Sequence, residues 1–314
     1  MAFKNEDMPR FRREMKQELI DRRLSHGPSR TANNIKLERR ISNFDGETCW
    51  LNSILQMILC AMDHNPYHHM FSTLGMELQR AQTQGLIDPR YMKLLLQSAE
   101  DARDGDSLNI MVGQQCARDA LVILTQNREA WIDIYSLLYH TTRQTTTCLN
   151  CSAQSYCDNE TLYTEHFCPE DNTNLKLFLE RISNHSSSVE YFCNQCNIRG
   201  EASQKLQIKT EESSSFFAIL LSRVEFNYTN QIHPCDDVRL IDCNGVPRDY
   251  TPLCVIEHRG GISDSADYTR HYLADVKNKM DGQWYHTSNA TEPKKLSQSE
   301  VTKTGYIFLY MRKE

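Results

Sequence analysis

Apolar side chains recur at helical spacing directly after Cys49. The repeat predicts an amphipathic helix that begins at about Cys49, and it consists of Leu51, Ile54, Leu55, Ile58, Leu59 and Met62. Similar repeats in residues 91–96 and 117–124 make the region from Asn52 to about His140 mostly helical. We expect breaks in this region at Asp88-Pro89 and at residues 104–106, where turn-forming residues interrupt the apolar pattern.

The pattern changes after about residue 145, where short apolar or alternating stretches replace the helical repeats. Residues 216–221 and 306–310 are two such stretches, and both predict strands. A helical first half followed by a stranded second half predicts an α+β fold with an active-site cleft between the two halves.

Cys49 falls in the first turn of the predicted helix, and His271 follows more than two hundred residues later. Unpaired N–H groups and the positive end of the helix dipole favour a thiolate at such a position. A neighbouring imidazole would serve as base and later as the acid that protonates the leaving amine. For an arbitrary one of the twelve cysteines, a buried structural role is the better reading. The helix start and the distant histidine favour a thiol protease for this one.

Composition and charge limit the class of protein. The chain has 314 residues, of which 39% are hydrophobic and 24% charged, as expected for a globular protein with enough chain to bury a core. It has no apolar run of the roughly 18 residues needed to cross a bilayer, and no secretory signal. We therefore expect a cytoplasmic or nuclear protein that does not bind membranes and whose cysteines are reduced. We expect it to be a monomer.

The first 40 residues differ from the remainder in charge. They hold eleven Lys and Arg against six Asp and Glu, which gives +5, whereas the rest holds 24 against 35, which gives −11. Phe11, Met15 and Leu19 fall on one helical stripe, which predicts a short amphipathic helix ending near residues 26–28. This basic extension, residues 1–40, could bind an acidic partner or be a solvated helix, and we assign it no role.

Two Cys-x-x-Cys pairs form a second constellation. They are Cys148 with Cys151 and Cys193 with Cys196. Four thiolates in this arrangement make a closed tetrahedral zinc site, which is structural rather than catalytic. A redox motif normally occurs once, at the start of a helix, so zinc is favoured. Cys157 and Cys168 could also reach the metal, but core or surface thiols are the better reading for them.

These motifs resemble the ubiquitin-specific protease family. Residues 46–53, Gly-Glu-Thr-Cys-Trp-Leu-Asn-Ser, match its cysteine box, and residues 114–121 are similar to its glutamine box. Residues 250–260 resemble its penultimate strand. The histidine box begins at His271, continues to Trp284 and ends with residues 305–312. The resemblance extends over about residues 41–313.

The resemblance implies a papain-like α+β catalytic domain over residues 41–314. Its parts would be a helical thumb at about 41–144, β fingers that carry structural Zn²⁺ at about 145–215, and a β palm at 216–314. The four paired cysteines would hold the zinc at the tips of the fingers. No catalytic cofactor is implied.

The family also implies a third catalytic residue, usually Asn or Asp, four positions after the tryptophan. That position is Ser288, and Asn289 follows it, so spacing favours Ser288 and side-chain chemistry favours Asn289. The family's oxyanion Asn lies five residues before the nucleophile, where this chain has Phe44. Asn43 could serve if the loop contains a bulge, together with backbone N–H groups near Cys49; otherwise Asn43 is a turn residue.

The substrate-binding residues that the resemblance implies are Gln114, Gln115, Asp119, Arg270 and Trp284. The family's glutamine box carries an acidic pair that faces the arginines of the ubiquitin tail, but the first of these positions is Cys116 here. The residue before the histidine, usually Gly, is Arg270. Recognition of the tail could therefore be altered, or other acidic residues could compensate.

The function implied is a thiol-dependent deubiquitinase that hydrolyses the isopeptide or peptide bond after the C-terminal Gly-Gly of ubiquitin through an acyl-enzyme on Cys49. A protease for a ubiquitin-like modifier and a catalytically weak ubiquitin-binding adaptor are the alternatives. Intact Cys49 and His271 argue against the adaptor. A nucleic-acid module is disfavoured because the body is acidic and lacks a basic stripe.

Overall fold

The computed structural model describes residues 40–41, 48–84, 86–102, 109–111, 115–169, 172–184, 186–222, 231–233, 236–259, 271–287 and 293–313. The chain divides between residues 36 and 37, and residues 37–314 form one compact unit. Six sets of predictions lie outside the described residues: the helix of the basic extension, the break at 104–106, the oxyanion residue Asn43, Gln114, Arg270, and the third-residue pair Ser288 and Asn289. No helix in the described part of the chain is long and apolar enough to cross a membrane.

The first half of this unit is mainly helical, as predicted. Its helices are α2 (Cys49–His64), α3 (Thr73–Gln84), α4 (Pro89–Ala102), α5 (Ala117–Gln126) and α6 (Ile132–Leu138), and a short parallel pair joins β1 (Arg40–Ile41) to β2 (Leu86–Ile87). The first fourteen residues of α2 are all buried, which makes it the central helix of this half. Pro89 is the first residue of α4, where its missing N–H costs no hydrogen bond.

An eight-stranded sheet dominates the second half. Its strand order is β15-β14-β13-β12-β16-β9-β5, with β11 paired to β12. The strands are β5 (Thr164–Phe167), β9 (Phe216–Ser222), β11 (Val238–Ile241), β12 (Pro247–Arg259), β13 (His271–Lys277), β14 (Trp284–Thr287), β15 (Lys294–Leu296) and β16 (Gly305–Arg312). The two apolar stretches singled out in the sequence are β9 and β16, which pair with each other.

This sheet separates two hydrophobic cores because side chains alternate between its faces. Along β9, Phe216, Ala218 and Leu220 join the core around α2, whereas Phe217, Ile219 and Leu221 join the other core. The second core also receives α7 (Leu175–Asn184), which packs on β11. Near it lie the short strand pair β6 (Thr173–Asn174) and β10 (Ile232–His233) and the 3₁₀ segments η2 (Thr210–Glu212) and η3 (Gln298–Glu300).

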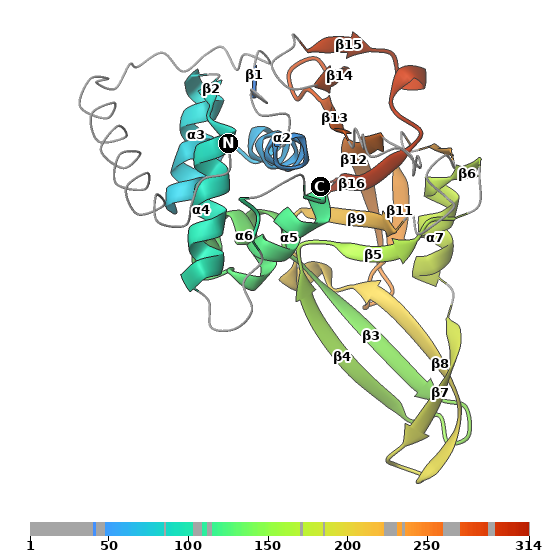
Figure 1. Ribbon diagram of the computed structural model, residues 1–314. Coiled ribbons are helices and arrows are strands. Elements are labelled where there is room, and N and C mark those ends of the chain that lie inside the picture. Colours follow the sequence, from blue (N-terminus) through green and yellow to red (C-terminus); the bar gives the residue numbers. More distant parts are fainter. Residues whose placement is uncertain are drawn as a thin grey trace, which may run out of the picture. The chain divides into compact units, whose positions relative to one another are not determined.

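A four-stranded sheet extends away from both halves, as Figure 1 shows. Its order is β4-β3-β8-β7, from β3 (His140–Cys148), β4 (Gln154–Thr161), β7 (Ser187–Cys193) and β8 (Ile198–Ile208). All its strand pairs are antiparallel. The β3–β4 and β7–β8 turns therefore lie at the same far end, and each of them carries one Cys-x-x-Cys pair.

Candidate active site and metal centre

Cys49 is the first residue of α2, and its side chain is fully buried. Thr48 precedes the helix and accepts the first helical hydrogen bond, from the N–H of Asn52 to its carbonyl oxygen over 2.9 Å. The N–H groups of the first turn have no carbonyl partner within the helix and point toward the amino end. They stabilise negative charge there, both on a thiolate and on an oxygen that develops charge next to it.

His271 is the first residue of β13, directly opposite Arg259 of β12. Burial lowers the pKa of the His271 imidazole, and the positive charges of Arg259 and His286 lower it further. The imidazole is therefore neutral at pH 7, which leaves one ring nitrogen free to accept a proton.

Tyr272 links α2, the helix that begins with Cys49, to β13, the strand that begins with His271. Burial raises the pKa of the Tyr272 hydroxyl, and the neighbouring thiols of Cys116 and Cys49 raise it further. Cys49 is thus an electrostatic neighbour of the residue that directly follows His271. Since α2 also packs against β13, the helix that begins with Cys49 and the strand that begins with His271 are neighbours in the fold.

The glutamine-box residues lie at the start of α5. Gln115 directly precedes Cys116, the N-cap residue of this helix, and the Cys116 N–H donates to the Asp119 carboxylate over 3.0 Å. The Cys116 sulfur lies 3.3 Å from the hydroxyls of both Tyr272 and Tyr306. The Asp119 carboxylate therefore caps its own helix, whatever else it contacts.

Trp284 is the first residue of β14 and is 5% exposed in the second core. It pairs with Lys277 on one side and Leu296 on the other. Trp284 is therefore placed to pack in the core and to support β14, the strand that precedes Ser288 and Asn289 in the sequence. At the end of this strand, the Thr287 hydroxyl donates to the Ala274 carbonyl over 2.7 Å and ties β14 to the histidine strand.

Two polar clusters beside His271 were not expected from the sequence. In the first, Asp275 is 2% exposed and accepts hydrogen bonds from His286 Nδ1 over 2.6 Å and from the Thr302 N–H over 2.8 Å. In the second, the buried carboxylate of Glu257 accepts a hydrogen bond from Arg259 over 2.8 Å and one from the Thr304 hydroxyl. Both clusters place a cationic or protonatable group next to His271.

The four cysteines predicted to bind zinc converge at the tip of the four-stranded sheet. The sulfurs of Cys148, Cys151, Cys193 and Cys196 all lie within 4.8 Å of one another. The sulfur–sulfur distance is 3.9 Å from Cys148 to Cys196 and 3.6 Å from Cys151 to Cys193. A tetrahedral ion with metal–sulfur bonds of about 2.3 Å needs sulfurs roughly 3.8 Å apart, so the cluster fits a metal ion.

The turns that carry these cysteines have the same backbone geometry. Ser152 N–H donates to the Cys148 carbonyl over 2.9 Å, and Asn197 N–H donates to the Cys193 carbonyl over 2.8 Å. Ser152 and Asn197 both have positive φ, at 61° and 55°. Cys157 on β4 and Cys168 are not part of the group, in agreement with the reading of them as ordinary surface and core thiols.

Comparisons with known proteins agree with this architecture. No protein-family model matches the chain. Ubiquitin carboxyl-terminal hydrolase 15 from Bos taurus and that from Homo sapiens are each 24% identical to this chain over 137 residues. The match covers 40% of this chain but only 13% of those proteins, so the chain matches a small part of their length.

Two solved structures of the SAGA DUB module, both of Ubp8 with Sgf11, Sus1 and Sgf73, resemble the chain with a TM-score of 0.63 and 16% identity. The complex bound to ubiquitin aldehyde is matched over 89% of this chain and 71% of that chain. The complex of a Ubp8 variant bound to monoubiquitin is matched over 95% and 75%. The predicted fold class is therefore confirmed: the chain has the α+β fold of Ubp8 in these DUB modules.

Proposed function

We propose that this chain, which has the fold of the ubiquitin-specific proteases, is a thiol-dependent deubiquitinase. Its substrate is the isopeptide or peptide bond after the C-terminal Gly-Gly of ubiquitin. The observation that carries the proposal is the position of Cys49 at the amino end of buried α2, beside the strand that begins with His271. A nucleophile at a helix start and a neutral imidazole on the facing strand are the two parts that thiol-protease chemistry requires.

In the first half of the reaction, the His271 imidazole accepts the proton of the Cys49 thiol. The thiolate sulfur then forms a bond to the carbonyl carbon of the terminal glycine. Backbone N–H groups at the start of α2 stabilise the resulting oxyanion, and we assign Asn43 a supporting role there. His271 returns the proton to the departing amine, and the carbon–nitrogen bond breaks to leave a thioester on Cys49.

In the second half, His271 accepts a proton from water, and the hydroxide attacks the thioester carbonyl. The carbon–sulfur bond breaks, which releases the modifier with a free carboxylate and regenerates Cys49. Ser288 or Asn289 orients the His271 ring through the ring nitrogen that does not exchange the proton. We keep both candidates, since spacing favours the first and side-chain chemistry the second.

We assign the four-cysteine cluster a structural Zn²⁺ ion. Four thiolates fill the tetrahedral coordination of zinc and leave no position for substrate, so the ion would stabilise the far end of the four-stranded sheet. We assign residues 41–144 to a thumb, 145–215 to fingers and 216–314 to a palm. The fingers would contact the folded modifier while its tail, bordered by Gln114, Gln115 and Arg270, enters the active site. We expect a cytoplasmic or nuclear monomer.

The start of α5 favours a second candidate substrate, a ubiquitin-like modifier. Asp119 uses its carboxylate to cap α5, and Cys116 places a thiol, not a carboxylate, beside two tyrosine hydroxyls. This end of the helix therefore offers less negative charge to an arginine in the tail than a pair of free carboxylates would. A catalytically weak adaptor remains the alternative from another class.

The test is reaction with modifiers that carry an electrophile at their C-terminus. Purified protein is treated with probes built on ubiquitin and on several ubiquitin-like modifiers. The Cys49→Ala variant tests the nucleophile, and Cys60→Ala, which removes a buried thiol from the same helix, is the matched control. We expect an adduct with one probe in the wild type and in Cys60→Ala and none in Cys49→Ala. A folded, metal-loaded protein that reacts with no probe would refute the protease and favour the adaptor.

A further inference from the structure

A group of polar side chains shares one face of the large sheet with His271. Asp275 lies on this face because side chains alternate along β13. The register of β12 against β13 places Arg259 directly opposite His271, and Glu257, two residues before Arg259, has the same orientation. His286 of β14 lies directly opposite Asp275. The base of the proposed reaction thus shares its face with two carboxylates and with two groups that can carry positive charge.

The Asp275 carboxylate holds the His286 ring in one tautomer. Asp275 is buried, and one of its oxygens accepts a hydrogen bond from His286 Nδ1 over 2.6 Å. The other oxygen accepts one from the Thr302 N–H over 2.8 Å. A buried carboxylate that loses a donor is strongly destabilising, so this pairing is retained in the folded protein. Since a carboxylate can only accept, the His286 proton lies on Nδ1.

Thr302 continues these hydrogen bonds toward β12. Its hydroxyl lies 3.2 Å from the Thr304 hydroxyl, which donates to the Glu257 carboxylate. The other Glu257 oxygen accepts a hydrogen bond from Arg259 Nε over 2.8 Å. A continuous series of hydrogen bonds therefore leads from His286 on β14, through the segment before β16, to β12. It holds three neighbouring parts of the sheet in register around the start of β13.

The bond between Asp275 and His286 lies directly before the candidates for the third catalytic residue. β14 ends at Thr287, and Ser288 is the next residue in the sequence. The Thr287 hydroxyl donates to the Ala274 carbonyl over 2.7 Å, so the last two residues of β14 are both tied to β13 by their side chains. The end of β14 is therefore fixed against the strand that begins with the catalytic histidine.

We propose that Asp275 and His286 are positioning residues for His271. Their hydrogen bond fixes the end of β14, and with it the point from which the third residue orients the His271 imidazole. The inference rests on the proposed function, because it requires His271 to be the base. His286 also acts through its charge: burial lowers the His271 pKa, and the positive charges of Arg259 and His286 lower it further.

The charged groups that face His286 come from both neighbouring strands. Asp275 faces it from β13, and Lys294 of β15 lies directly opposite it. Lys294 is exposed and interacts with the charge of Glu300 in η3. Of these three charges, that of Asp275 is buried and is therefore screened least by salt.

The test compares two substitutions of His286 that have nearly the same shape. His286→Asn keeps an N–H donor at the position of Nδ1 but carries no charge, whereas His286→Leu removes the donor as well. With ubiquitin joined to aminomethylcoumarin as substrate, we expect His286→Leu to lower kcat about tenfold with KM unchanged, because the orientation of the base matters in the transition state. His286→Asn should restore kcat at high pH. Its acidic limb of kcat/KM should move to higher pH, because a charge that lowers the His271 pKa is absent.

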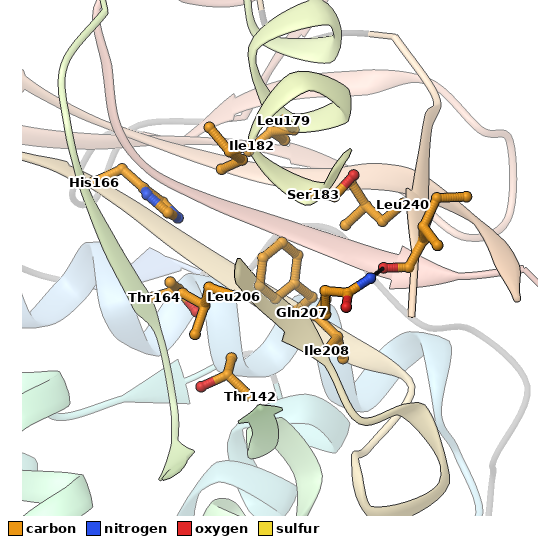
Figure 2. A pocket seen from close by; sticks show the side chains of 12 residues that line it. Thr142, Thr164, His166, Leu179, Ile182, Ser183, Leu206, Gln207, Ile208 and Leu240 are labelled. Atoms are coloured by element: carbon orange, nitrogen blue, oxygen red, sulfur yellow. Dashed lines mark hydrogen bonds between the residues drawn. The ribbon is translucent and has the colours of Figure 1, made fainter. Parts of the chain in front are cut away.

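His166→Leu is the matched control, because it makes the same substitution at another partly buried histidine. His166 lies on β5 in the wall of the cavity that Figure 2 shows, and none of the residues lining this cavity belongs to β12, β13 or β14. We expect kcat, KM and the acidic limb of this variant to match the wild type.

Three results would overturn the inference: a wild-type kcat in His286→Leu, an equal loss of kcat in the Leu and Asn variants, or the same loss in His166→Leu. If His286→Leu melts below the wild type, His286→Thr takes its place, since Thr suits a strand and its hydroxyl lies one bond short of the Nδ1 position. A wild-type chain that does not cleave the substrate would refute the proposed function. An active chain with any of the three results would refute the positioning role alone.

Discussion

The main-chain N–H of Cys116 donates to the carboxylate of Asp119 over 3.0 Å, which closes a capping box at the start of α5. The same cysteine directs its thiol toward the hydroxyls of Tyr272 and Tyr306. Cys116 thus connects the start of α5 to β13 through Tyr272 and to β16 through Tyr306. The sequence predicts that Asp119 binds substrate. Its capping of α5 is a structural role that would explain an Asp at this position equally well.

Substitutions of Asp119 separate these two roles. Asp119→Ala removes the acceptor, so we expect it to lower the free energy of unfolding by about 1 kcal/mol, as for other helix caps. Asp119→Asn keeps an acceptor oxygen and removes the charge, so its stability should stay close to wild type. Urea unfolding checks both values. If KM for a ubiquitin substrate rises in Asp119→Asn although stability is retained, the charge binds substrate and capping is not its only role.

Arg259→Gln tests the electrostatic setting of His271. Burial and the charges of Arg259 and His286 lower the His271 pKa, so removal of one charge raises it again. A base must be deprotonated to act, and the acidic limb of the pH profile of kcat/KM should therefore move to higher pH. Arg259 is 58% exposed, so added salt should reduce the difference between variant and wild type.

Arg239→Gln is the control for this shift. Arg239 is also exposed and paired with a carboxylate, Asp249, but it lies on β11, beside the opposite end of β12 from Arg259. Its removal should leave the acidic limb in place. If the pH profiles of kcat/KM for Arg259→Gln and wild type superimpose at low salt, Arg259 does not influence the pKa of His271.

Much of the fold could be predicted because its main elements carry strong periodic signals. The apolar repeat after Cys49 defines a helix on its own, and the apolar runs of β9 and β16 define buried strands. The metal cluster was predictable because Cys-x-x-Cys pairs hold their own two sulfurs close together. Only the meeting of the two pairs depends on long-range strand pairing, and the antiparallel β3–β8 ladder provides it.

The polar surroundings of His271 could not be predicted, because they depend on which strands are neighbours. Asp275 meets His286 only through the register of β13 against β14, and Arg259 faces His271 only through that of β12 against β13. Side chains alternate between the two faces of a strand, so the sequence places Asp275 on the same face of β13 as His271. This spacing was the one sequence signal for the polar surroundings of His271. Likewise, the contact between Cys116 and Tyr272 joins residues 156 positions apart.

The four-cysteine cluster predicts a requirement for one Zn²⁺ ion per chain. Cys193→Ser removes a buried thiol of the cluster, and we expect it to abolish zinc binding and to open the far end of the four-stranded sheet, because metal binding contributes about 10–16 kcal/mol in zinc-finger peptides. Cys157→Ser is the control, since Cys157 is exposed on β4 outside the cluster. Metal analysis should give one zinc for the wild type and this control. Equal zinc in Cys193→Ser and wild type would contradict the assignment.

His140 should make the protein sensitive to mild acid. It is completely buried at the start of β3, and burial lowers its pKa to about 3. In the unfolded chain a histidine has a pKa of about 6.5, so below that pH the unfolded state binds a proton that the folded state does not. The free energy of unfolding should therefore fall as pH decreases, by about 1.4 kcal/mol per pH unit for this residue. The half-buried His64 and His166, whose pKa values are also lowered, act in the same direction.

The measurement is urea unfolding between pH 7 and pH 5, above the range in which unfolded carboxylates titrate. His140→Gln retains hydrogen-bonding groups but does not titrate, so its stability should depend less on pH, by about 2 kcal/mol over the interval down to pH 5. His69→Gln replaces an exposed histidine and should keep the wild-type slope. Because the slope is compared rather than the absolute stability, any packing cost of the Gln side chain drops out. Identical slopes for all three proteins would mean that His140 gains its proton without unfolding, and that the start of β3 opens to water on its own.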